Sequence, residues 1–236
     1  MPAAVFVIGD VHGCLAQMRD LEARIVENAS AIQGEKLLVY IGDLIDRGPN
    51  SAGVLDHLLL PAPKGFERLV ICGNHELMFL DFLDAPSLSS PWLNFGGRET
   101  LLSYGIEISD SKRLHRLQLQ IETLVPHEHR EFLEKLPVAL ELPSHFIVHA
   151  GINPARPLSN QHIEDMTGIR HAFLNHSGGF EKCVVHGHTP VDEVLISADR
   201  IAIDTGAYGT GRLSAVRLVE NTSPQVLSSD AAAVAM

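Results

Sequence analysis

Short apolar runs that end at a glycine recur five times along the chain. They are rich in β-branched residues, and their length suits buried strands better than helices. The five runs cover residues 5–9, 37–42, 68–73, 145–151 and 183–187. We therefore predict five strands at these positions.

The segments between the first three runs have the spacing of helices. Their apolar residues recur every three or four positions, which is the repeat of one helix face. These residues are Leu15, Met18, Leu21 and Ile25 in the first segment and Val54, Leu55, Leu58 and Leu59 in the second. Strands that alternate with helices predict βαβ units, a largely parallel sheet and an α/β fold.

The remainder of the chain falls into three stretches. Residues 77–143 have a mostly helical pattern, broken by prolines and by a Gly-Gly pair, and we expect this insert to pack over one end of the sheet. Residues 195–207 and 213–219 predict antiparallel strands joined by tight turns. No linker divides the chain, so we predict one domain over residues 1–220 and a flexible tail over residues 221–236.

The overall composition argues against several classes of protein. The 236 residues are 45% hydrophobic, which is enough for a buried core and too much for a disordered chain. A formal net charge of −11 argues against nucleic acid or an anionic membrane as the main partner. A small phosphorylated substrate is still allowed, since bound metal ions would reverse the sign of the charge locally.

Cysteine usage indicates a reducing compartment. Cys14, Cys72 and Cys183 lie far apart without a CxxC pair, which argues against a disulfide framework. The chain shows no signal-peptide pattern and no apolar run of about 18 residues. We predict a cytoplasmic protein, and nothing in the sequence indicates its oligomeric state.

Potential metal ligands follow each of the five predicted strands. Loops at the carboxyl ends of strands converge in α/β folds, and ligands bind there. Glycines beside these residues allow sharp turns and a close approach to an ion. The side chains combine oxygen and imidazole donors, and they are Asp10, His12, Asp43, Asn74, His149 and either His186 or His188. This donor set predicts a metal site that needs no thiolate.

Six protein ligands exceed the needs of one tetrahedral ion and fit two ions that share a carboxylate. Asp43 is the natural bridge, because the remaining groups then divide between the two ions. Asp10 and His12 are two residues apart, so their side chains leave the same face of an extended segment. Two divalent cations would outweigh the charge of Asp10 and Asp43 and leave a positive site for a phosphate dianion.

The motifs around these residues resemble those of the calcineurin-like metallophosphoesterases. They occur in that superfamily's order, as GDVHG (9–13), GDLIDRGPNS (42–51), GNHE (73–76), IVHAGINP (147–154) and HGHTP (186–190). The DRGP and GNHE forms are similar to those of the phosphoprotein phosphatase branch, in particular its small bacterial and phage serine/threonine protein phosphatases. The resemblance implies a central β-sandwich of mixed sheets flanked by helices. Ala150 departs from the family's usual glycine.

The resemblance also implies a ligand set. Asp10 and His12 would hold the first metal ion, Asp43 would bridge, and the second ion would be held by Asn74, His149 and His188. Periodicity does not choose between His186 and His188, and the family's GHT pattern selects His188. The resemblance favours Mn²⁺, and the donor set is also compatible with iron or Zn²⁺.

Four further residues acquire roles from the same resemblance. Arg47 and Arg170 would bind phosphate oxygens. His75 would be the general acid that protonates the leaving oxygen, and Asp46 would orient its imidazole. The expected reaction is hydrolysis of a phosphate ester by a metal-bridging hydroxide that attacks phosphorus.

Three functions are compatible with these motifs. The resemblance favours phosphoserine and phosphothreonine in proteins as substrates, and symmetrical hydrolysis of diadenosine tetraphosphate is the main alternative. A non-catalytic scaffold with this fold is the third, but such a protein would be expected to have lost some of these residues. The role of the 77–143 insert in specificity is not evident from its sequence. We predict the other histidines to be at the surface, among them His57, His115, His127, His129, His162 and His176.

Overall fold

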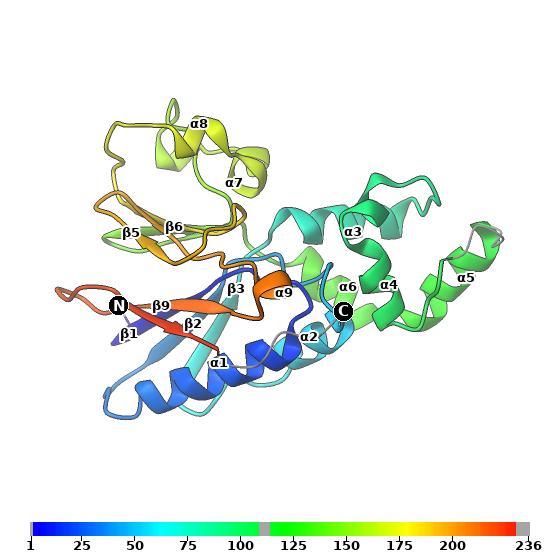
Figure 1. Ribbon diagram of the computed structural model, residues 1–236, viewed down its shortest axis with the longest axis horizontal. Helices are drawn as coiled ribbons and strands as arrows, with labels where there is room; N and C mark the ends of the chain where they lie inside the picture. Colours follow the sequence, from blue (N-terminus) through cyan, green and yellow to red (C-terminus); the bar gives the residue numbers. More distant parts are fainter. Residues whose placement is uncertain (1, 109–113, 230–236) are drawn as a thin grey trace.

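Two five-stranded sheets form the centre of the computed structural model, which describes residues 2–108 and 114–229 (Figure 1). The first sheet has the order β10-β9-β1-β2-β3 and the second has the order β4-β5-β6-β8-β7. The first contains β1 (Ala4–Ile8), β2 (Lys36–Tyr40), β3 (Phe66–Val70), β9 (Ser214–Leu218) and β10 (Gln225–Ser228). The second contains β4 (Ala139–Glu141), β5 (His145–Val148), β6 (Cys183–His186), β7 (Leu195–Ile196) and β8 (Arg200–Ala202).

The five predicted strands are confirmed, but they are shared between the two sheets. Strands β1, β2 and β3 pair in parallel in the first sheet, and β5 and β6 pair in parallel in the second. Antiparallel strands complete each sheet, so both are mixed. The architecture agrees with the β-sandwich that the motif resemblance implies.

The alternation of side chains along β1 explains why it is apolar on both faces. Val5 and Val7 pack between the two sheets, together with Val185 and Ile201 of the second sheet. Phe6 and Ile8 point to the opposite face and join a different cluster. Successive side chains of a strand leave opposite faces, so a strand buried on both sides reads as a continuous apolar run.

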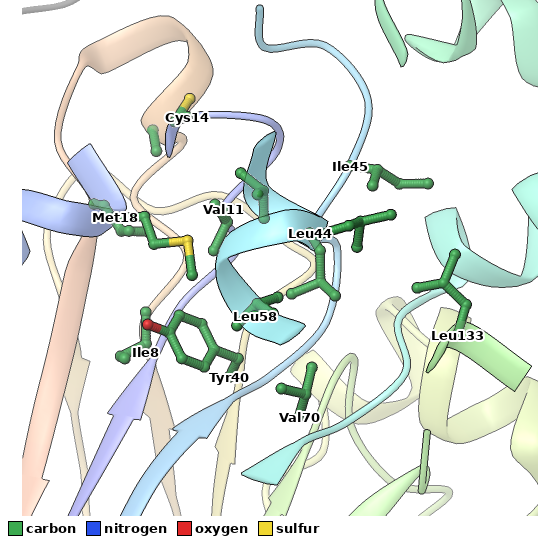
Figure 2. Packing of buried hydrophobic residues seen from close by; sticks show 14 of the residues in the cluster. Ile8, Val11, Cys14, Met18, Tyr40, Leu44, Ile45, Leu58, Val70 and Leu133 are labelled. Atoms are coloured by element: carbon green, nitrogen blue, oxygen red, sulfur yellow. The ribbon is translucent and has the colours of Figure 1, made fainter. Parts of the chain in front are cut away.

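Helices cover the outer face of each sheet. Helices α1 (Leu15–Asn28) and α2 (Ser51–Leu59) bury their apolar sides against the first sheet, and α3 (Asn74–Asp84) extends the same core. Figure 2 shows Met18, Tyr40 and Leu58 within it. Short helices α7 (Ile163–Gly168) and α8 (His171–Leu174) cover the second sheet. The result is a four-layer arrangement of helices, two sheets and helices.

The insert after β3 is helical, as predicted, and it packs against the first helical layer. It contains α3, a 3₁₀ turn η1 (Pro91–Asn94), α4 (Gly97–Ser103), α5 (Leu114–Leu124) and α6 (His127–Glu134). Trp92 of η1 stacks on Phe79 of α3 with ring centroids 5.1 Å apart. The insert therefore lies beside the end of the first sheet, near the loops that follow β2 and β3.

The C-terminal part of the chain differs from the prediction in two ways. Strands β8 and β9 do not form a hairpin, because β8 belongs to the second sheet and β9 pairs with β1 in the first. The chain crosses between the sheets through α9 (Ala207–Thr210), which starts after Gly206 at a φ of 63°. The antiparallel pairing expected of this region is found between β7 and β8 and between β9 and its neighbours β1 and β10.

The predicted flexible tail is wrong for residues 225–228. They form the edge strand β10, which pairs with β9 from Gln225 opposite Arg217 to Ser228 opposite Ser214. Backbone hydrogen bonding to β9 and packing of Leu227 against the core explain the strand. Residues 230–236, the end of the predicted tail, lie outside the described residues.

Within the described part of the chain, no helix is long and apolar enough to cross a membrane. All three cysteines are free, as predicted. The cytoplasmic location remains a prediction.

A buried ionic cluster fixes α1 and α2 to the first sheet. The Glu22 carboxylate accepts hydrogen bonds from Tyr40 at 2.6 Å and from Arg68 at 3.1 Å, and it pairs with His57 at 2.6 Å. The prediction that His57 is a surface residue is therefore wrong. His129 is also buried, where it contacts Tyr104 and Asp56. Local spacing gave no sign of these contacts between distant segments.

Glu22→Gln is expected to lower the free energy of unfolding by about 3 kcal/mol near neutral pH, because it leaves the buried Arg68 guanidinium without its counter-charge. Burial alone would raise the pKa of Glu22, but hydrogen bonds from His57 and Tyr40 and the nearby Arg68 charge lower it. The stabilising effect is therefore complete above the ordinary value of 4.5 and is lost as pH falls through the lower folded value. Urea unfolding should show that the difference in unfolding free energy between wild type and variant shrinks as the pH is lowered below 4.5. The control Glu67→Gln, at an exposed position, should change the free energy of unfolding little. A destabilisation by Glu22→Gln that is the same at neutral and at acidic pH would contradict the assignment.

Candidate metal centre

Unusual backbone conformations mark the loops that hold the predicted site. Among the described residues, six non-glycine residues have a positive φ, and five of them belong to the predicted set. The five are His12 at 44°, Asp43 at 47°, Asp46 at 73°, Arg47 at 64° and His188 at 63°. Such conformations cost free energy and persist where the surrounding structure enforces them, often at functional sites. The extended conformation expected at His12 is therefore not observed.

Asp43 lies at the centre of two groups of potential ligands. One group consists of His12, Asp43 and His75, and the other consists of Asp43, His149 and His188. The Asp43 Oδ2 atom is 3.5 Å from His12 Nε2, and Oδ1 is 3.3 Å from His149 Nε2. The two carboxylate oxygens thus face different groups, which suits a ligand shared between two ions.

The second group also includes the predicted amide. His149 Nε2 lies 3.1 Å from the Asn74 Oδ1 atom and 3.2 Å from His188 Nδ1. The structure places His188 in this group and His186 elsewhere. The His186 ring is buried edge-on against Phe173, with centroids 4.9 Å apart, and its Nδ1 atom contacts the Gly187 carbonyl.

Backbone carbonyls orient two of the imidazoles. The Nδ1 atom of His12 lies 2.9 Å from the Ile45 carbonyl, and that of His149 lies 2.9 Å from the Ile41 carbonyl. Each Nδ1–H then donates to the carbonyl, which leaves the Nε2 lone pair directed at Asp43. Burial lowers the pKa of His12 to about 3 and also lowers that of His149, so both rings are neutral donors at physiological pH.

Asp10 is buried next to this centre and lacks a complete set of partners. Its Oδ2 atom accepts a hydrogen bond from the His188 backbone N–H at 3.0 Å, while Oδ1 is buried without any hydrogen-bond partner. Burial and the charges of Asp204 and Asp43 raise the pKa of Asp10 well above its ordinary value. A cation would satisfy the free oxygen and stabilise the charged form. The residues present therefore fit a pair of divalent ions.

His75 and Asp46 form a buried pair beside Asp43. The His75 Nδ1 atom is 2.6 Å from Asp46 Oδ2, and His75 Nε2 is 3.8 Å from Asp43 Oδ2. Burial alone would lower the pKa of His75, but the charge of Asp43 and the hydrogen bond to Asp46 raise it. The raised pKa favours uptake of a second proton at Nε2, the atom that faces the centre and that, while unprotonated, accepts a hydrogen bond from Arg47 at 3.1 Å.

Two arginines lie at the edge of the centre. The Arg47 guanidinium contacts His12 Nε2 and His75 Nε2, each at 3.1 Å, and lies over the Tyr208 ring at 4.9 Å. Arg170 contacts the second group through His188, with its Nε atom 3.0 Å from His188 Nε2. All ten predicted site residues are thus gathered in one place by loops from both sheets.

Two buried carboxylates at this centre are absent from the predicted set. Glu76 accepts hydrogen bonds from the backbone N–H groups of Asp43, Leu44 and Gly73, each at 2.8 Å, and so fixes the turn that carries Asp43. Asp204 follows β8, and its charge contributes to the raised pKa of Asp10. The sequence does carry a signal for Asp204, because Ile203-Asp204-Thr205-Gly206 again joins an apolar run to an acid and a glycine.

The chain is similar in sequence to known phosphoesterases. The family model of the calcineurin-like phosphoesterases matches residues 3–221. A serine/threonine-protein phosphatase 1 from Salmonella typhimurium is 32% identical over 223 residues, covering 91% of this chain and 91% of that protein. An asymmetrical bis(5'-nucleosyl)-tetraphosphatase PrpE from Oceanobacillus iheyensis is 28% identical over 243 residues, covering 94% and 91%.

Solved structures share the fold. A crystal structure provisionally described as a diadenosine tetraphosphatase matches with a TM-score of 0.65 at 23% identity, over 97% of this chain and 95% of that one. A protein serine/threonine phosphatase from Saccharomyces cerevisiae matches with a TM-score of 0.57 at 13% identity, over 99% and 82%. The match of the family model over nearly the whole chain shows that this protein belongs to the calcineurin-like phosphoesterases, a family of metal-dependent phosphoesterases.

Proposed function

We propose that this chain hydrolyses phosphate monoesters, with phosphoserine and phosphothreonine in proteins as its substrates. The observation that carries the proposal is the position of Arg47 and His75 beside Asp43: a guanidinium that can bind phosphate lies 3.1 Å from an imidazole that can protonate a leaving oxygen. The 32% identity to a serine/threonine-protein phosphatase supports this choice of substrate.

The ligand assignment builds on the two groups around Asp43, with Asp10 as a ligand in place of His75, which is assigned to proton donation. Asp10, His12 and Asp43 would hold one ion, and Asp43, Asn74, His149 and His188 would hold the other. When bound, two divalent cations supply positive charge to the phosphoryl group and make water a nucleophile at neutral pH. Mn²⁺ is the proposed ion, and iron and Zn²⁺ suit the same donors.

The remaining residues bind and protonate the substrate. Arg47 and Arg170 bind phosphoryl oxygens from the two sides of the centre, because each contacts a different ligand group. His75 then donates its Nε2 proton to the leaving serine or threonine oxygen. Asp46 accepts the Nδ1–H hydrogen bond, which holds the ring and stabilises its charged form. This proton transfer is needed because an alkoxide is a poor leaving group.

A second candidate is hydrolysis of a dinucleoside tetraphosphate. It is favoured by the relatives described as asymmetrical tetraphosphatases, of which the Oceanobacillus iheyensis protein is 28% identical to this chain. These relatives favour asymmetrical cleavage over the symmetrical cleavage that the motifs alone allow. Arg47 and Arg170 would then bind part of a longer polyphosphate.

One assay separates the two candidates. The purified protein is given a phosphoserine peptide or diadenosine tetraphosphate at equal concentration, each with Mn²⁺ and with a chelator. We expect phosphate release from the peptide, dependent on Mn²⁺, with a kcat/KM at least about tenfold higher than for the dinucleotide. Preferential formation of AMP and ATP from the dinucleotide would favour the second candidate. Hydrolysis of neither substrate would contradict the proposal.

A further inference from the structure

The Asp46 carboxylate contacts two residues of the insert in addition to His75. Trp92 of η1 donates its indole N–H to Asp46 Oδ2 at 2.7 Å. Thr100 of α4 donates its hydroxyl to Asp46 Oδ1 at 2.5 Å. Both carboxylate oxygens are thus held by side chains that lie 46 and 54 residues further along the chain.

These contacts restrict the carboxylate in both position and orientation. Asp46, Trp92, Thr100 and His75 are all buried, with no more than 2% of any of them exposed. An indole nitrogen can only donate, so Trp92 requires an acceptor at Oδ2, which is the same oxygen that faces His75 Nδ1. The Thr100 hydroxyl oxygen also accepts a hydrogen bond from the Asp46 backbone N–H at 2.9 Å, so Thr100 contacts both the backbone and the carboxylate of Asp46.

The two donors are themselves fixed by packing. The Trp92 ring stacks on Phe79 and lies against Phe82, with centroids 5.1 and 4.6 Å away. The indole also packs directly against the backbone of Gly97, since a Cβ at this position would lie only 2.4 Å from Trp92 Cδ2. The packing of the insert therefore determines where the Asp46 carboxylate lies, and through it where the His75 ring points.

We infer that Trp92 and Thr100 are positioning residues for proton transfer, which act on the leaving oxygen only through Asp46 and His75. This inference rests on the proposed role of His75 as the proton donor. It gives the insert a role in turnover, in addition to any part it has in substrate selection.

The inference is tested by the dependence of the rate on the leaving group. A serine alkoxide needs a proton to leave, whereas nitrophenolate leaves without one, so loss of proton transfer slows only the first kind of substrate. Trp92→Phe and Thr100→Val should each lower kcat for a phosphoserine peptide by about 10- to 100-fold. Each should change kcat for p-nitrophenyl phosphate by less than about threefold and leave KM unchanged.

Two further variants separate positioning from loss of folding. Thr100→Ser keeps the hydroxyl and should retain most of the peptide activity. Ser103→Ala, on the same helix, removes a hydroxyl that donates to the Thr100 carbonyl and does not contact Asp46. The ratio of kcat for the peptide to kcat for p-nitrophenyl phosphate should therefore not change. Equal losses on both substrates in Trp92→Phe and Thr100→Val would overturn the inference.

The dependence on His75 is tested by combining variants. In a His75→Ala background, Trp92→Phe should cause no further loss of peptide activity, because the group on which it acts is gone. A full additional loss there would overturn the inference while leaving the proposed function intact. If His75→Ala lowers kcat equally for both substrates, the proton-donor role of His75 is wrong, and the inference that rests on it is wrong as well.

Discussion

Asp43→Asn is expected to abolish binding of at least one metal ion and to lower turnover by about 10³-fold or more. Asp43 is the one residue common to both ligand groups, and its two oxygens face His12 and His149. Charge stabilisation by such ions is worth several kcal/mol in the transition state, and each ~1.4 kcal/mol is a factor of ten in rate. The neutral amide keeps the shape of the side chain and removes the charge that the ions require.

Metal content and thermal stability give this prediction a readout besides activity. Wild-type protein should gain about 3 kcal/mol of stability in Mn²⁺ at a hundred times its dissociation constant, and the variant should gain much less. Asp192→Asn is a suitable control, because Asp192 is exposed on a loop outside both groups. Full stabilisation of Asp43→Asn by Mn²⁺ would contradict the bridging role.

His75→Ala is expected to lower kcat for a phosphoserine peptide by about 10²- to 10⁴-fold while both metal ions remain bound. The reason is the position of the ring, which lies 2.6 Å from the Asp46 carboxylate and whose pKa is raised by the charge of Asp43 and by the hydrogen bond to Asp46. Metal analysis and steady-state kinetics on the same preparation test this expectation. His115→Ala is the control, since His115 is exposed on α5.

The metal analysis also discriminates between two roles for His75. The ring lies within the same group as His12 and Asp43, so its geometry is compatible with metal binding as well as with proton donation. Loss of one ion from His75→Ala would show that His75 is a metal ligand, and would contradict its role as the proton donor. Retention of both ions with wild-type turnover would show that no acid is needed at this position.

Residues directly after strands were predictable because their signal is local. Asp10, Asp43 and His149 each follow an apolar run and stand beside a small residue, and the fold brings all three together. The strands themselves were predictable for the same reason, since burial on both faces makes each run apolar throughout. Their division between two sheets was not evident from periodicity, because strands of both sheets have this pattern.

Residues that support the site from a distance could not be predicted in this way. Trp92 and Thr100 reach Asp46 across 46 and 54 residues, and no spacing in the sequence marks such a contact. Glu76 lies within the GNHE motif, but its three backbone donors come from two different loops. Strand β10 was missed because its residues are mostly polar or exposed and its pairing with β9 is a backbone interaction.

The central claim is that separate loops of this chain form one centre for two metal ions around Asp43. Anomalous diffraction from crystals grown with Mn²⁺ tests it most directly. We predict two peaks within bonding distance of the Asp43 carboxylate, one also bound by Asp10 and His12 and the other by Asn74, His149 and His188. A single peak, or peaks away from Asp43, would contradict the claim.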